Sequence, residues 1–191
     1  MTTSSKSRIR IIGGKWRGRK LEVIEAVGLR PTPDRIRETL FNWLAASCPG
    51  ARVLDCFAGS GALGLEALSR GAKRLVALEQ QPQALANLRL QAQKLDTAEI
   101  DIVGGNALES IPRLRQKFDL IFIDPPYARP ELRQQVLQQL EAHDCLQPGA
   151  RLYFEWPNSE EFELPAPSLH WLKQKTAGQV SYAIAEWQLS S

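Results

Sequence analysis

Strand-like and helix-like segments alternate along most of this 191-residue chain, and this alternation restricts the possible folds more than any other feature. Short runs typical of buried strands occur at residues 52–56, 75–79, 100–103, 118–124 and 150–156. Helix-like segments lie between them, at residues 62–70, 82–95, 107–115 and 130–142. This order predicts an α/β fold in which helices cover both faces of a parallel sheet.

The two ends of the chain depart from the alternation. Residues 171–175 and 179–189 have no helix between them, which predicts an antiparallel hairpin at the edge of a seven-stranded, mostly parallel sheet. Residues 8–24 contain two strand-like runs separated by glycines, which predicts a small basic β-hairpin. After it, Thr32 is expected to cap a helix whose first residue is Pro33. We therefore expect an N-terminal arm, residues 1–28, and a main domain, residues 29–191.

Charge is unevenly distributed along the chain. Residues 1–37 carry ten basic and three acidic side chains, whereas the remainder carries 14 basic and 18 acidic ones. A cationic arm on a mildly acidic body favours a polyanionic partner. The three cysteines form no CxxC pair, so we expect no disulfide, no metal site and a cytoplasmic location. We also expect no membrane segment, since no run approaches about 20 apolar residues.

A glycine-rich segment, Gly59-Ser60-Gly61, lies between the first strand of the main domain and the helix after it. Glycines at this place let a ligand approach the backbone at a helix N-terminus. Asp55 ends the strand, and its carboxylate would repel a pyrophosphate but would pair with an ammonium group. The pattern favours a cofactor that ends in a zwitterionic amino acid. The alternative is a glycine turn that only lets helix and strand pack closely.

Two further polar residues follow neighbouring strands. Glu79 lies 24 positions after Asp55, a separation typical of acids that bind the ribose of an adenosine group. Taken alone, Glu79 is also compatible with a solvated acid at a strand end. Asn106-Ala107 follows the third strand, where the amide can bind an adenine edge or cap the next helix.

The tetrapeptide Asp124-Pro125-Pro126-Tyr127 has the narrowest chemical meaning in the chain. Two prolines cannot continue a sheet ladder, so an acid and an aromatic ring are left at the carboxyl edge of the sheet. The Asp124 carboxylate and the Pro125 carbonyl can accept both N–H bonds of an exocyclic amine, and Tyr127 offers a stacking face. The pattern predicts a site for an amino-bearing nucleobase. A turn that merely ends the strand is the alternative.

The basic arm is the expected contact with nucleic acid. Its cations would bind phosphates, and Trp16 would stack on an unpaired base. The candidate RNA-binding residues are Arg10, Lys15, Trp16, Arg17, Arg19, Lys20, Arg30 and Arg35. Arg37 and Thr32 lie near Arg30 and Arg35 at the start of the helix, where these four residues can reach the cofactor or RNA. A solvated cationic tail is the alternative.

Four segments together resemble the class I S-adenosylmethionine-dependent methyltransferases, and specifically the RsmD family. They are residues 10–21, 29–42, 54–66 and 124–127. The family methylates the N2 amine of one guanine in bacterial 16S ribosomal RNA. The resemblance spans nearly the whole chain and implies a Rossmann-like methyltransferase domain, residues 29–191, behind the RNA-contacting arm.

The resemblance also implies roles for individual residues. Asp124, Pro125, Pro126 and Tyr127 would hold the guanine. The S-adenosyl-L-methionine site would comprise Thr32, Asp55, Phe57, Gly59, Ser60, Gly61, Glu79, Gln80, Asn106 and Ala107. The implied partner is 16S ribosomal RNA within a 30S subunit or an assembly intermediate, bound by a monomeric enzyme.

Three other functions are compatible with parts of the sequence. A DNA amino-methyltransferase shares the Asp-Pro-Pro-Tyr turn but normally has a separate target-recognition region, for which this chain has little room. An NAD-dependent oxidoreductase shares the glycine turn, but Asp55 and the proline turn disfavour it. A noncatalytic RNA-binding module would use the arm alone.

Overall fold

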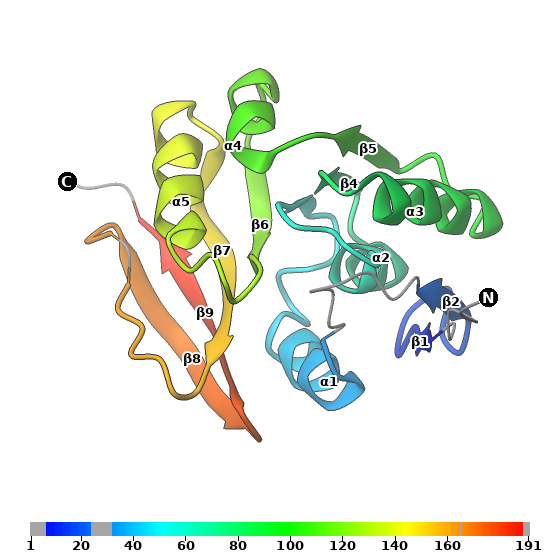
Figure 1. Cartoon of the computed structure of the whole chain (residues 1–191), viewed down its shortest axis with the longest axis horizontal. Helices are drawn as coiled ribbons and strands as arrows, with labels where there is room; N and C mark the ends of the chain where they lie inside the picture. Colours follow the sequence, from blue (N-terminus) through cyan, green and yellow to red (C-terminus); the bar gives the residue numbers. More distant parts are fainter. Residues whose placement is uncertain (1–6, 24–31, 165, 189–191) are drawn as a thin grey trace.

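A seven-stranded mixed sheet forms the centre of the computed structural model, which describes residues 7–23, 32–164 and 166–188 (Figure 1). The strands are β1 Ser7–Arg10, β2 Lys20–Val23, β3 Arg52–Asp55, β4 Arg74–Glu79, β5 Ile100–Gly104, β6 Phe118–Ile123, β7 Leu146–Pro157, β8 Leu169–Ala177 and β9 Val180–Trp187. The helices are α1 Asp34–Trp43, α2 Ala62–Ser69, α3 Pro82–Lys94, α4 Ala107–Ser110, the 3₁₀ turn η1 Ile111–Arg113, and α5 Leu132–Ala142.

The strand order of the large sheet is β5-β4-β3-β6-β7-β9-β8. Strands β3 to β7 pair in parallel, and β9 pairs antiparallel with both β7 and β8. The chain runs outward from β3 through β4 to β5 and then returns to place β6 on the other side of β3. The carboxyl ends of β3 and β6 therefore flank a topological switch point, where open α/β sheets bind their ligands. The prediction of a mostly parallel sheet with a terminal antiparallel hairpin is confirmed.

Residue alternation in the central strands divides the core into two layers. Val53, Leu120 and Phe122 face a cluster that includes the buried side chains of α1, α2 and α3. Their neighbours Leu54 and Ile121 face the second cluster, with η1 and α5. Each central strand is buried on both faces, which explains its continuous apolar run.

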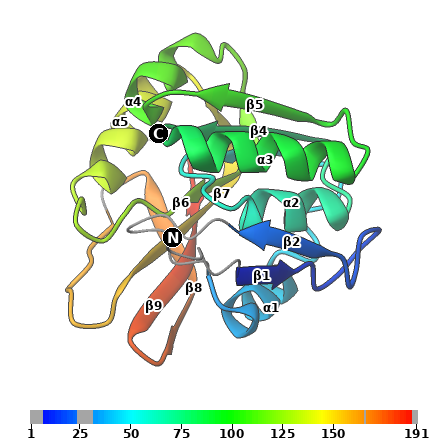
Figure 2. The ribbon, with the colours of Figure 1, turned by 45° about the vertical axis from the view of Figure 1, so that its right-hand side comes forward.

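The predicted N-terminal hairpin is present as β1 and β2, which pair antiparallel. Figure 2 shows it beside α2 and α3, away from the β8 edge of the sheet. Ile11 and Leu21 are buried in the same cluster as the first layer of the main domain. The boundary expected at residue 28 falls in segment 24–31, which lies outside the described residues.

The loop of this hairpin is attached to α2 by a buried carboxylate. The Oε2 and Oε1 atoms of Glu66 accept the backbone N–H groups of Ile12 and Gly13, each at 2.8 Å. Oε1 also accepts from Arg70 Nε at 2.7 Å, and Arg37 lies 3.5 Å from Oε2. Glu66 and Arg37 are completely buried, so these contacts join hairpin, α1 and α2 in the interior.

Three expected boundaries are wrong. Pro33, not Thr32, occupies the N-cap position of α1, because the Pro33 carbonyl accepts the first N–H groups of the helix. The helix expected at residues 107–115 shortens to α4 followed by η1, where Pro112 lacks the N–H that an α-helix requires. Strand β7 begins at Leu146, before Pro148, and its pairing with β6 shifts register there. In the described part of the chain, no helix combines the length and apolarity of a membrane span.

Candidate active site

The predicted site residues of the sheet come together at one edge. Asp55, Glu79 and Asp124 end or follow β3, β4 and β6, which are neighbours in the parallel sheet. Asp55 pairs in register with Phe122, two residues before Asp124, and Cys56 donates to the Phe122 carbonyl at 3.1 Å. Adjacent strands lie ~4.8 Å apart. The three acids therefore lie near one another at the switch point.

The glycine turn is held in place by Glu79. Its Oε2 accepts the N–H of Gly59 and its Oε1 accepts the N–H of Gln81, both at 2.7 Å. Gly61 is the N-cap of α2 with φ of 79°, a conformation that favours glycine. Ser60 is partly exposed between them. Glu79, only 6% exposed, thus fixes the loops after β3 and β4 as well as presenting a carboxylate at the sheet edge.

Asp55 is buried with polar contacts from the backbone. Its Oδ1 accepts the N–H of Phe57 at 3.4 Å. Burial raises the pKa of Asp55 from 3.8 to about 7, because the N–H groups of Phe57 and Gly64 only partly offset the loss of water, and Glu79 adds repulsion. A carboxylate in this environment is stabilised by a cationic group of a ligand. Asp55 therefore fits the ammonium end of an amino-acid cofactor.

Asp124 lies among groups that shift its pKa. Its pKa is raised well above 3.8, first by burial and then by the nearby charges of Glu155 and Asp55. Arg133 opposes this shift. Pro125 is buried, whereas Pro126 and Tyr127 are exposed. The turn thus presents a partly buried acid with a perturbed pKa beside an open aromatic ring, a combination typical of catalytic sites.

Glu155, near the end of β7, was missed by the sequence analysis. Its two carboxylate oxygens accept from the hydroxyls of Tyr127 and Tyr153, each at 2.8 Å. Glu155 lies within a continuous run of buried residues in β7, a position where an acid is rare unless it is paired. That position was the available signal, but the partner could not be inferred without the order of the strands.

The other residues predicted to bind the cofactor differ in their burial and in their hydrogen bonds. Asn106 caps α4, with its Oδ1 accepting the N–H of Leu108 at 2.9 Å, so its structural role is present. Ala107 is buried and Gln80 is exposed. Thr32 is 7% exposed, directly after segment 24–31, and forms no side-chain cap of α1.

Most of the predicted RNA-binding side chains are exposed. Arg10, Arg17, Arg19, Lys20 and Arg35 lie on the surface of the hairpin and α1. Some are already engaged within the chain: Lys15 pairs with Glu99 at 2.6 Å, and Arg19 donates to the carbonyl of Lys94 at 2.9 Å. Arg30 lies outside the described residues.

Two expectations for this region need correction. Trp16 is only 8% exposed, within the first core cluster, so its ring is not an open stacking surface. Arg37 is completely buried, where it donates to the Arg10 carbonyl at 2.9 Å and cannot reach RNA. Both residues bury large side chains between the hairpin and the helices, which the local sequence pattern did not reveal.

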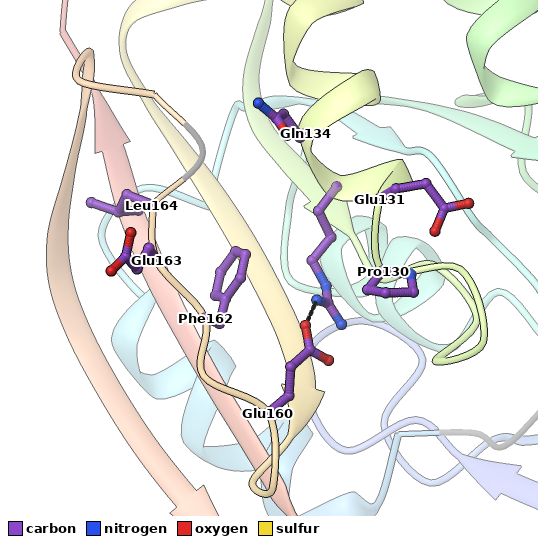
Figure 3. A pocket seen from close by; sticks show the side chains of 8 residues that line it. Pro130, Glu131, Gln134, Glu160, Phe162, Glu163 and Leu164 are labelled. Atoms are coloured by element: carbon purple, nitrogen blue, oxygen red, sulfur yellow. Dashed lines mark hydrogen bonds and ion pairs between the residues drawn. The ribbon is translucent and has the colours of Figure 1, made fainter.

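A cavity of about 320 Å³ lies between the start of α5 and the segment after β7. Figure 3 shows Pro130 and Gln134 on one side and Glu160 and Phe162 on the other, with a dashed line at the ion pair of Glu160. The partner in that pair is Arg133, at 2.6 Å. None of the predicted site residues that the structure describes lines this cavity, but Arg133 connects it electrostatically to Asp124.

Comparison with known proteins identifies close relatives of the chain. Residues 9–186 match the family described as "Conserved hypothetical protein 95". Ribosomal RNA small subunit methyltransferase D of Escherichia coli K12 is 42% identical over 183 residues, which cover 95% of this chain and 91% of the relative. The protein of the same name from Haemophilus influenzae is 40% identical, with 96% of each chain covered.

A solved structure agrees with the sequence comparison. The protein yhhF from Escherichia coli superposes with a TM-score of 0.89 at 37% identity, covering 96% of this chain and all of that one. The similarity in fold and in sequence therefore extends over both the hairpin and the sheet.

Proposed function

The chain belongs to the family of "Conserved hypothetical protein 95", which includes ribosomal RNA small subunit methyltransferase D, and we propose that it methylates the N2 amine of one guanine in 16S ribosomal RNA. The proposed methyl donor is S-adenosyl-L-methionine. The observation that carries the proposal is the position of Asp124, which follows β6 directly beside the Asp55 end of β3. A nucleobase amine at one strand end would meet a cofactor at the next.

The cofactor fits the residues on the β3 and β4 side of this edge. The buried Asp55 carboxylate suits the ammonium of the methionine part, and the glycine turn between β3 and α2 starts directly after it in sequence. Glu79 suits the ribose hydroxyls. When bound, S-adenosyl-L-methionine would supply an electrophilic methyl group by cleavage of its methyl–sulfur bond, with S-adenosylhomocysteine as the leaving group.

The residues of the turn would orient and activate the amine. The Asp124 carboxylate and the Pro125 carbonyl accept its two N–H bonds, which directs the nitrogen lone pair toward the methyl group. As the nitrogen gains the methyl it loses one proton, for which Asp124 is the acceptor. The raised pKa of Asp124 makes its ionised form a stronger proton acceptor, although a smaller fraction is ionised near neutral pH.

The exposed cations of the hairpin support RNA as the polymer. Arg8, Arg17 and Lys20 stand on the surface of a hairpin whose interior is fixed to α2. Phosphate contacts from this surface would give affinity and orientation, whereas the turn would select the base. We propose that a monomer acts on RNA in a 30S subunit or an assembly intermediate. Methylation of protein-bound but not free RNA would be the expected result.

The variant Asp124→Ala tests the proposal. We expect methyl transfer to 16S ribosomal RNA to fall by about 100-fold or more, because the amine loses its principal acceptor. Affinity for S-adenosylhomocysteine should stay within about twofold, since Asp55 and Glu79 remain. Transfer of a labelled methyl group, followed by mapping of the modified base, measures activity. Calorimetry measures the affinity for S-adenosylhomocysteine.

Asp119→Ala is a matched control on the same strand. Asp119 lies on β6, one residue after its start, where it pairs with Arg52 at 3.2 Å. This variant should keep its activity. Equal loss of transfer and cofactor binding in Asp124→Ala would contradict the assigned role, and wild-type label found only in DNA or protein would contradict the substrate.

A further inference from the structure

Glu155 is a buried acid next to the proposed base-binding turn. It lies on β7, which pairs with β6 in register at Phe154 and Ile123. Glu155 is therefore one strand away from Asp124, and it is only 5% exposed. A carboxylate in such a place is stable only when hydrogen bonds replace its water.

Two tyrosine hydroxyls supply hydrogen bonds from different directions. Tyr153 is completely buried and packs edge-on against Phe122 of β6, with ring centroids 6.1 Å apart. Its hydroxyl donates to Glu155 Oε2. The hydroxyl of Tyr127 donates to Glu155 Oε1. One tyrosine thus anchors the carboxylate in the core, and the carboxylate anchors the other tyrosine at the surface.

The anchor matters because the Tyr127 ring is otherwise exposed. Tyr127 is 40% exposed and follows two prolines that fix the backbone of the turn but not the side chain. A ring with two side-chain torsions would sample several orientations in water. A hydrogen bond from the ring's far end to a buried acceptor restricts these orientations. The stacking face is then held in one plane before a base arrives.

We propose that Glu155 is a positioning residue for methyl transfer, which acts by holding the Tyr127 hydroxyl so that the ring is preset against the incoming base. The inference rests on the proposed function, since it presupposes a nucleobase at the turn. A carboxylate suits this task better than an amide does. It has two acceptor oxygens for two hydroxyl donors, whereas a glutamine has one oxygen and an amino group.

Removal of one hydroxyl distinguishes positioning from plain stacking. Tyr127→Phe keeps the ring and removes the hydroxyl that donates to Glu155. We expect kcat to fall by about fivefold to 30-fold while KM for RNA stays within about twofold, because phosphate contacts set RNA affinity. Glu155→Leu, which offers no acceptor to either hydroxyl, should lose at least as much kcat. The double variant should lose no more than the worse single variant, because both changes break the same bond.

Tyr153→Phe is the matched control. It removes the other hydroxyl from the same carboxylate and leaves the bond between Glu155 and Tyr127 in place. We expect its loss of kcat to be at least threefold smaller than that of Tyr127→Phe. Full activity of Tyr127→Phe, or losses that multiply in the double variant, would overturn the proposal.

A second measurement is independent of the reaction. The chain has three tyrosines, so ring-¹³C labelling gives signals for Tyr127, Tyr153 and Tyr182 that single variants assign. Glu155→Leu, which has no acceptor, should shift and broaden the Tyr127 signal and leave that of Tyr182 unchanged. An unchanged Tyr127 signal contradicts the positioning role. Absence of wild-type guanine methylation with a shifted signal would instead contradict only the proposed function.

Discussion

At the scale of single residues, the acids of the candidate site differ in what surrounds them. Glu79 accepts two backbone N–H groups at 2.7 Å, and Glu155 accepts two tyrosine hydroxyls. Asp55 has a longer contact to Phe57, at 3.4 Å, and a raised pKa. Of these three carboxylates, Asp55 therefore has the most to gain from a bound cation.

The pKa of Asp55 predicts a pH-dependent affinity for the cofactor. Because this pKa is about 7, the carboxylate ionises between about pH 6 and pH 8. We expect affinity for S-adenosylhomocysteine to rise over this range, by up to about tenfold per pH unit below the pKa, provided that the ligand's ammonium remains protonated. Calorimetry at several pH values measures this affinity.

Asp55→Asn is the control for this effect. The variant should bind weakly, and its affinity should vary less with pH. A wild-type affinity that is flat across this range would contradict the assignment. The raised pKa of Asp55 also predicts that the stability of the fold depends on pH. Protonated Asp55 favours the folded state relative to the ionised form. This contribution is complete below the unfolded-state pKa of about 4 and is lost as the pH rises through about 7.

At the scale of elements, the contact between the hairpin loop and α2 is the least expected feature. The N–H of Lys15 donates to the Ser69 carbonyl at 2.7 Å, and Ser69 Oγ donates to the Gly13 carbonyl. Together with Glu66, these bonds use the backbone of the loop rather than its charges. The cationic side chains are thereby left on the outer surface.

Gly14 is the position where this contact is tightest. It has φ of 78°, and a Cβ atom there would lie 1.7 Å from the Ser69 carbonyl oxygen. Gly14→Ala should therefore separate the loop from α2 and lower the free energy of unfolding by about 2–4 kcal/mol. Urea denaturation measures the change.

Gly18→Ala separates backbone strain from the steric clash. Gly18 lies in the same loop with φ of 83°, but no atom lies within 4 Å of a Cβ built there. We expect this variant to lose only about 1 kcal/mol, the strain of the left-handed conformation. Equal destabilisation by the two variants would show that close packing on α2 contributes nothing.

At the scale of the whole molecule, the exposed cations of the hairpin and the acids of the candidate site lie in different places. The net charge is only +3, yet exposed cations are concentrated on the hairpin, which lies beside α2 and α3 (Figure 2). The acids gather at the carboxyl edge. A polyanion would therefore be held by the hairpin surface while a neutral base enters the acidic edge.

RNA affinity should accordingly depend on salt through the hairpin. Arg17→Ala should reduce the slope of log affinity against log salt concentration by about one, because one phosphate contact is lost. Lys173→Ala, an exposed cation on the edge strand β8, is the control and should leave the slope unchanged. Filter binding at several salt concentrations measures both. The same slope for Arg17→Ala as for the wild type would remove Arg17 from the interface.

Local patterns were sufficient for the parallel sheet and for the positions of its polar strand ends. Apolar runs in β4 and β6 and the prolines after Asp124 depend on neighbours in sequence, so they could be interpreted without the fold. Parallel strands also share one carboxyl edge, which is why the residues Asp55, Glu79 and Asp124 were expected together.

The tertiary structure alone decided which side chains are buried and which acids are paired. Trp16 and Arg37 belong to a basic segment, but packing on α2 removes both from the surface. Glu155 meets Tyr127 only because β7 lies next to β6. Such contacts join residues far apart in sequence, and they follow from strand order and core packing, which no local periodicity specifies.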